Sequence, residues 1–115
     1  MHPSPEPDDD TFLIAWTTTA RKDDAEALAR TLLDAQCVAC AQIDGPISSL
    51  YTWEGKLSSA QEYRLTLKFF KQHQPAVEAA IKRHHPYQTP QWIVVASHAV
   101  GESYHLWAKS VTKTT

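Results

Sequence analysis

Residues 47–69 read ISSLYTWEGKLSSAQEYRLTLKF, two alternating segments joined around one glycine. The second segment places apolar and polar side chains at alternate positions, which is typical of a strand with one buried face. The apolar set is Tyr63, Leu65, Leu67 and Phe69, and the polar set is Glu62, Arg64, Thr66 and Lys68. Gly55 is the only glycine near the midpoint, so the chain reverses most easily there. These residues predict a long antiparallel hairpin.

The first arm of this hairpin begins well before residue 47. A mostly apolar stretch, Val38 to Ile43, predicts a strand that is bent or bulged at Gly45-Pro46 and resumes at Ile47. Beyond the bend, every second side chain shares one face. That set is Ile47, Ser49, Tyr51 and Trp53.

The segment before the hairpin predicts a strand and then a helix. Phe12 to Trp16 is an unbroken apolar run, as in a strand buried on both faces, and Thr17-Thr18-Thr19 suits a helix cap. Asp23 and Asp24 then lie in a first helical turn, where the helix dipole favours acids. The apolar stripe of this helix is Ala25, Leu28, Ala29, Leu32 and Leu33.

The segment after the hairpin predicts a helix, then a strand and then a last helix. Pro75 suits the first turn of a second helix, and Pro86 forbids its continuation. The face of this helix is Val77, Ala80, Ile81 and His84. Trp92 to Ala96 predicts a second buried strand, and a last helix follows with Tyr104, Trp107, Ala108 and Val111 on one stripe. The order strand, helix, strand, strand, helix, strand predicts an α+β fold of the split βαβ type.

Composition limits the possible partners. The 115 residues carry 11 Lys and Arg against 13 Asp and Glu, so the net charge of −2 offers no general field for nucleic acid or an anionic membrane. Residues 1–10 read as a disordered leader and 11–115 as a single domain. The absence of a signal peptide pattern or membrane span favours a cytoplasmic protein. Only two cysteines are present, which fits a reducing compartment.

Two strands of the predicted sheet have an uncovered side. In a split βαβ fold both helices lie on one face of the sheet, yet Phe12–Trp16 and Trp92–Ala96 are apolar on both faces. The short last helix is too small to cover the open face. We therefore expect an oligomer that packs sheets against one another.

The pair His84-His85 is the best metal candidate. Neutral imidazole suits copper, zinc and nickel, and the C-terminal end of a helix attracts cations. The two rings converge only if the chain leaves the helix at His85, which Pro86 favours. Two histidines also need a third ligand or water. The alternative, one half-buried and one surface histidine capping helix carbonyls, is about equally supported.

Other candidate residues have weaker patterns. Cys37 and Cys40 form a C-x-x-C, but residues three apart on a strand face opposite ways, so packing is favoured, with Cys40 as a small buried side chain. A second group could line a cleft between subunits, although the sequence supports a solvated face or an interface salt bridge better. This group is Tyr51, Trp53, Glu62, Lys68 and Tyr87.

No catalytic constellation is visible. The sequence has neither a nucleophile elbow nor a helical His-Glu-x-x-His, and its three glycines form no phosphate loop. It also lacks the aromatic pattern of an RNA-binding sheet. A binding protein is therefore favoured over an enzyme.

Two motifs give the chain a family resemblance. Ser49-Leu50-Tyr51-Thr52-Trp53-Glu54-Gly55-Lys56 and His84-His85-Pro86-Tyr87-Gln88-Thr89-Pro90 closely resemble CutA, the divalent-cation-tolerance family. Ala39-Cys40-Ala41, Glu62, Lys68 and Tyr104-x-x-Trp107 support the match, which runs from about Phe12 to Val111.

The resemblance implies a ferredoxin-like subunit in a tight homotrimer, with long hairpins reaching to neighbours, in the bacterial cytoplasm. It also implies a link to copper and other divalent ions through His84 and His85. Bacterial relatives can carry a copper-associated cysteine where this chain has Trp16, and many have Glu at Gln88 or Gln91.

Two functions follow from the residues and the resemblance together. The first is a trimeric divalent-cation-tolerance protein that binds divalent metal, copper above all. The second is a regulatory or scaffolding trimer, similar to the PII signalling proteins, that binds a small ligand or partner protein at the inter-subunit cleft.

Overall fold

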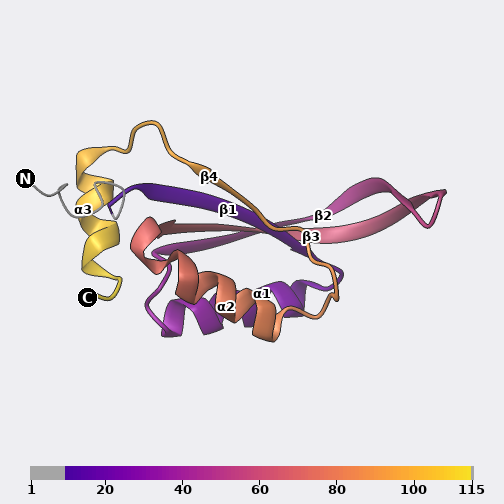
Figure 1. Cartoon of the computed structure of the whole chain (residues 1–115), viewed down its shortest axis with the longest axis horizontal. Helices are drawn as coiled ribbons and strands as arrows, with labels where there is room; N and C mark the ends of the chain where they lie inside the picture. The colour runs from indigo at the N-terminus through magenta and orange to yellow at the C-terminus, as the bar shows by residue number, and fades with distance from the viewer. Residues whose placement is uncertain (1–9, 115) are drawn as a thin grey trace, which may run out of the picture.

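The computed structural model describes residues 10–114 and contains four strands and three α-helices (Figure 1). In chain order these are β1 (Phe12–Thr19), α1 (Lys22–Asp34), β2 (Cys40–Trp53), β3 (Lys56–Phe70), α2 (Gln74–His84), β4 (Ile93–Ala96) and α3 (Glu102–Ser110). A short 3-10 turn, Lys71–His73, connects β3 to α2. This is the predicted α+β order with a C-terminal helix.

The strands form one antiparallel sheet in the order β2-β3-β1-β4. Both α1 and α2 cover the same face of this sheet, whereas α3 lies across its end, next to the start of β1 (Figure 1). The arrangement is the predicted ferredoxin-like split βαβ fold. No helix within residues 10–114 is long and apolar enough to cross a lipid bilayer.

The main core lies between the sheet and the two helices. Leu65 and Leu67 of β3 are fully buried there against Leu32 of α1 and Val77 of α2. Burial of each such aliphatic side chain stabilises the fold by about 1.5–3 kcal/mol. A smaller cluster lies under α3 and consists of Phe12, Ala39, Phe70 and Ala108.

The predicted hairpin is confirmed and ends in a two-residue turn. Trp53 of β2 pairs with Lys56 of β3, and Glu54 and Gly55 between them have φ angles of 50° and 77°. Positive φ at both positions matches the twist of the flanking strands, which is why short hairpins favour this turn.

The predicted bulge is also confirmed, and it decides which side chains share a face. Asp44 pairs with Arg64 and Ile47 with Glu62, so β2 advances three residues while β3 advances two. The extra residue brings the odd-numbered residues beyond the bulge onto the face that carries Glu62 and Arg64. As predicted, Ile47, Ser49, Tyr51 and Trp53 share that face.

One face of the sheet carries an exposed apolar surface, which we call the open face: Ile14 and Trp16 of β1 and Ile93 and Val95 of β4. Ile14 pairs with Val95 and Trp16 with Ile93, so the four side chains are adjacent. Ile93 and Val95 are 50% and 40% exposed. The expectation that β4 is buried on both faces therefore fails within one chain, where Val94 alone of these β4 residues packs against the core.

Two local predictions were wrong. The threonines Thr17 to Thr19 continue β1 and are buried, and the α1 N-terminus has no side-chain cap. Cys37, rather than Cys40, is the fully buried thiol, because the positive φ of Gln36 turns the chain back over the core before β2 begins. Burial raises the pKa of the Cys37 thiol, as expected of a packing residue.

The predicted leader, residues 1–10, lies outside the described residues except for Asp10. The carboxylate of Asp10 is 2.9 Å from Nζ of Lys109 in α3.

Candidate functional site

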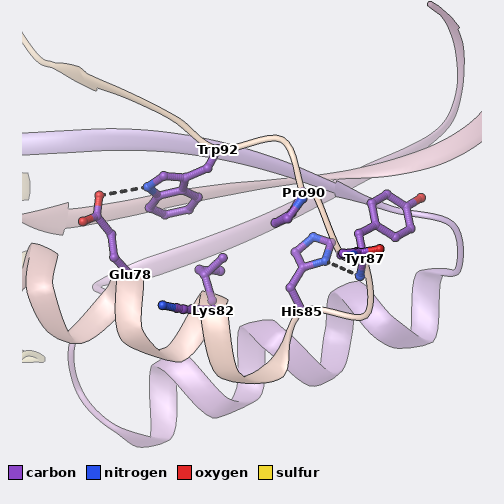
Figure 2. A pocket seen from close by; sticks show the side chains of 8 residues that line it. Glu78, Lys82, His85, Tyr87, Pro90 and Trp92 are labelled. Atoms are coloured by element: carbon purple, nitrogen blue, oxygen red, sulfur yellow. Dashed lines mark hydrogen bonds between the residues drawn. The ribbon is translucent and has the colours of Figure 1, made fainter. Parts of the chain in front are cut away.

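The candidate site surrounds the end of α2 and the segment that returns from it to β4. The helix ends at His84 because the backbone of His85 is extended (φ −68°, ψ 133°) and Pro86 follows. The sharp exit turns His85 and Tyr87 back toward the sheet (Figure 2). The predicted end of this helix is thus confirmed.

Both ring nitrogens of His85 are hydrogen-bonded within the chain. Nδ1 accepts the backbone N–H of Tyr87 at 3.0 Å. Nε2 therefore carries the proton and donates to the carbonyl oxygen of Thr18 at 3.0 Å. Oγ1 of Thr17 lies 2.9 Å from the same nitrogen. His85 consequently links the segment after α2 to the end of β1.

This geometry requires neutral imidazole. Burial lowers the pKa of His85, although the carbonyl of Thr18 and the charges of Asp24 and Glu62 oppose the change. A neutral ring with both nitrogens engaged has no lone pair left for a metal ion. In this conformation His85 is a structural residue, and metal binding at Nδ1 would require breaking its bond to Tyr87.

The depressed pKa makes stability depend on pH. Below the ordinary value of 6.5 the unfolded chain takes up a proton at His85 that the folded chain resists. We therefore expect the free energy of unfolding to fall as pH drops from about 7.5 to about 5.5. In a His85→Gln variant this component is expected to vanish, leaving a shallower slope. Urea unfolding with a chelator present measures both slopes, and parallel curves would contradict the assignment.

His84 occupies a different position. Its side chain is exposed, contrary to its predicted place on the buried face of α2, where Val77 and Ile81 are the buried residues. It lines a shallow hollow of about 150 Å³ between α1 and α2, together with Asp24. His85 lines a separate hollow, so the two rings do not converge on one point. Within residues 10–114 no group of three or more His, Cys, Asp or Glu side chains is placed to hold a metal ion.

Tyr87 ties the same segment to the hairpin. Its hydroxyl donates to Oε2 of Glu62 at 2.9 Å. Burial first, and then this hydrogen bond to the carboxylate, raise the pKa of Tyr87 to about 12, so it stays a phenol and a donor.

Four of the five predicted cleft residues lie together. Tyr51, Trp53, Glu62 and Tyr87 line a hollow of about 650 Å³ between the hairpin and the segment after α2. Trp53 is 57% exposed and Tyr51 43% exposed there.

Lys68, the fifth predicted cleft residue, is elsewhere in the chain. Six residues along an extended strand separate it from Glu62 by about 20 Å. It pairs across the sheet with Cys40 and Ile14, and its Nζ lies 5.8 Å from the ring centroid of Tyr104. Within one chain, Lys68 therefore stabilises the α3 end of the sheet and does not line the hollow.

Sequence reasoning missed the partners of this segment. Thr17 and Thr18 lie 67 or more positions before His85, and no local pattern connects them. Glu78 and Trp92 were also missed, although their side chains are hydrogen-bonded at 2.9 Å. The available signal was Trp92 itself, because a half-buried indole N–H requires an acceptor.

Comparisons with known proteins agree on one family. The family model described as CutA1 divalent ion tolerance protein matches residues 13–111. A divalent-cation tolerance protein CutA from Escherichia coli is 38% identical over 85 residues, covering 74% of this chain and 76% of the relative. The protein of the same name from Yersinia pestis is 35% identical over 95 residues, covering 83% and 80%.

Solved structures of that family share the fold. The CutA1 crystal structure from Pyrococcus horikoshii is 31% identical, with a TM-score of 0.84, and the match covers 89% of this chain and 99% of that one. The CutA1 structure from Ehrlichia chaffeensis is 27% identical, with a TM-score of 0.86, covering 90% and 97%. The region that the family model matches includes all of the sheet except Phe12, both covering helices and the hairpin. The chain is therefore a member of the CutA1 divalent ion tolerance protein family.

Proposed function

We propose that the chain is a cytoplasmic homotrimer that binds divalent metal, copper above all, and contributes to metal tolerance without catalysing a reaction. Membership of the CutA1 family and the printed names of its relatives support the tolerance role. A net charge of −2 is consistent with a partner other than nucleic acid or an anionic membrane.

The strongest support for the proposed assembly is the exposed apolar surface of the open face. Four adjacent apolar side chains there are left without cover by α1 and α2. The hairpin adds exposed aromatic groups on the same face of the sheet, with Trp53 at 57% and Tyr51 at 43%. Contiguous apolar surface of this kind is typical of an interface with another protein. Copies of the same chain are the occupants that the family resemblance implies, in a closed threefold ring.

For the metal, His84 is the first proposed ligand. Its exposed imidazole lies at the C-terminal end of α2, where the helix dipole favours a cation, and Asp24 on the same hollow offers an oxygen. Among divalent first-row ions, copper binds nitrogen ligands most tightly. His85 joins as the second ligand only by exchanging its bond to Tyr87 for the metal.

Calorimetric titration of Cu²⁺ tests this assignment. We expect His84→Ala to weaken binding by about tenfold or more, since it removes the accessible nitrogen. His85→Ala is expected to weaken binding and also to lower stability. The matched control is His98→Ala, which removes another exposed histidine and should leave copper affinity unchanged. Equal affinity in the wild-type and His84→Ala proteins would remove these ligands from the proposal.

A second candidate function rests on the hollow lined by Tyr51, Trp53, Glu62 and Tyr87. Its volume of about 650 Å³ is within the range of small-ligand sites, and its aromatic lining suits a ligand or a partner protein. A PII-like regulatory or scaffolding trimer would use such a site between subunits. The copper titration separates the two candidate functions. If the role is regulatory and independent of metal, the His84→Ala substitution should not change the copper affinity.

A further inference from the structure

We propose a small-molecule site on the helix side of the fold, which has His85 and Tyr87 at one end and is distinct from the His84 hollow and from the hairpin hollow. It is a pocket of about 340 Å³ between α2 and the segment returning to β4 (Figure 2). We infer that it takes a small zwitterion with an apolar body, that is, an α-amino acid with an apolar side chain. The inference goes beyond the proposed function and stands without it.

The apolar part of the pocket comes from three side chains. Ile81 is a buried residue of α2, and Pro90 and Trp92 come from the returning segment. Figure 2 shows Trp92 and Pro90 on the returning segment, facing α2 across the pocket. A flat indole, a proline ring and an aliphatic side chain suit an apolar ligand group and offer it no hydrogen bonds.

The indole wall is held in place. Nε1 of Trp92 donates to Oε2 of Glu78 at 2.9 Å, and the same oxygen accepts Nε2 of Gln74 at 3.0 Å. Two bonds to one oxygen fix both the carboxylate and the indole before any ligand arrives. A preorganised wall lowers the entropy that binding must otherwise overcome.

Opposite charges flank this apolar part. Glu78 and Lys82 are four residues apart, so they lie on the same face of α2, and both line the pocket. Glu and Lys at this spacing commonly pair, but here Glu78 is bonded to Trp92 and Gln74 instead. Across residues 10–114 neither an ion pair of Lys82 nor a hydrogen bond to Oε1 of Glu78 is present. One acceptor and one cation thus remain available, one helical turn apart.

An amino acid matches this arrangement. Its ammonium would donate to Oε1 of Glu78, its carboxylate would accept from Nζ of Lys82, and its side chain would pack on Trp92. The pocket volume is at the small end of the usual range for ligand sites, about 300–1,000 Å³, which suits a ligand as small as an amino acid. A simple cation would use Glu78 alone, and a simple anion Lys82 alone.

The indole N–H of Trp92 provides a direct readout. In a two-dimensional nitrogen–proton NMR spectrum each of the four tryptophans gives one indole signal, and sequential assignment identifies that of Trp92. We expect L-leucine to shift this signal in a saturable way. Leucinamide, which lacks the carboxylate, and N-acetyl-leucine, which lacks the ammonium, are each expected to bind about tenfold more weakly.

Charge-neutralising variants assign the two ends. Lys82→Met keeps the aliphatic stem, and Glu78→Gln keeps an acceptor for the indole, so both should fold. Each is expected to weaken leucine binding about tenfold, and Lys82→Met should leave leucinamide binding unchanged. Lys22→Met on α1, which does not line the pocket, is the control with wild-type binding. No shift of the Trp92 signal up to the solubility of leucine, or equal binding of the three compounds, would overturn the proposal.

Discussion

Replacing Gly45 with alanine is expected to lower the free energy of unfolding by about 3 kcal/mol. Gly45 has a φ of +147°, a conformation that side chains oppose. A Cβ at this position would lie 2.8 Å from the carbonyl oxygen of Glu62 and 3.1 Å from Cα of Tyr63. Both are backbone atoms of the neighbouring strand, so they cannot move aside without breaking the hairpin pairing. Urea unfolding at one fixed protein concentration measures the effect.

The two other glycines form an internal control series. Gly55 also has a positive φ, of +77°, but a Cβ there meets nothing within 4 Å, so Gly55→Ala should lower stability by only about 1 kcal/mol. Gly101 has a φ of −57° and equally open surroundings, so Gly101→Ala should be nearly neutral. Similar losses at all three positions would show that close backbone approach at Gly45 is not the cause.

Replacing Trp16 with glutamate is expected to convert the proposed trimer into monomers at micromolar concentration. Trp16 lies on the open face beside Ile93, where the proposed neighbour would cover it. Each subunit would then bury an unpaired carboxylate, at a cost of several kcal/mol per charge, and a closed ring would contain one in every copy. Light scattering after size-exclusion chromatography gives the mass of the wild-type and variant proteins.

A matched substitution separates assembly from folding. Leu33 on α1 is an apolar side chain that is 41% exposed, and α1 covers the opposite face of the sheet. Leu33→Glu should therefore leave the mass unchanged. Circular dichroism of the Trp16→Glu protein should retain its helix and strand signals. A wild-type monomer, or a trimer in the Trp16→Glu variant, would contradict the proposed interface.

Local patterns predicted the framework of the fold. The alternation from Glu62 to Phe69 identified β3, Gly55 located the turn, and Gly45-Pro46 located the bulge. Pro86 marked the end of α2. Each of these residues or patterns determines the backbone conformation of its own segment. The local sequence is therefore enough to predict its effect.

The candidate site was predicted less completely because its contacts are long-range. His85 is held by Thr17 and Thr18 of β1, and only the finished sheet brings them together. The two adjacent histidines resemble a chelating pair in the sequence. Their different surroundings, one exposed and one fully hydrogen-bonded, depend on how the chain leaves α2.

Distance along the strand explains why Lys68 lies apart from Glu62 within one chain. Side chains at alternate positions share a face, and this rule placed Lys68 with Glu62 correctly on one side of β3. The rule contains no information about separation, and three repeats already span about 20 Å. To assign residues to one site, the distance between them along the strand is needed as well as the face of the sheet that they share.

The one-residue insertion in β2 near Gly45 also limits how the hairpin can change length during evolution. Adding one residue to each arm would exchange the two surfaces of the hairpin. Leu50 and Leu57 would then lie on the surface that now carries Tyr51 and Trp53. Adding two residues to each arm would restore the original surfaces and extend the reach by about 7 Å. Related proteins with longer or shorter arms are therefore expected to differ by even steps, unless a second bulge compensates.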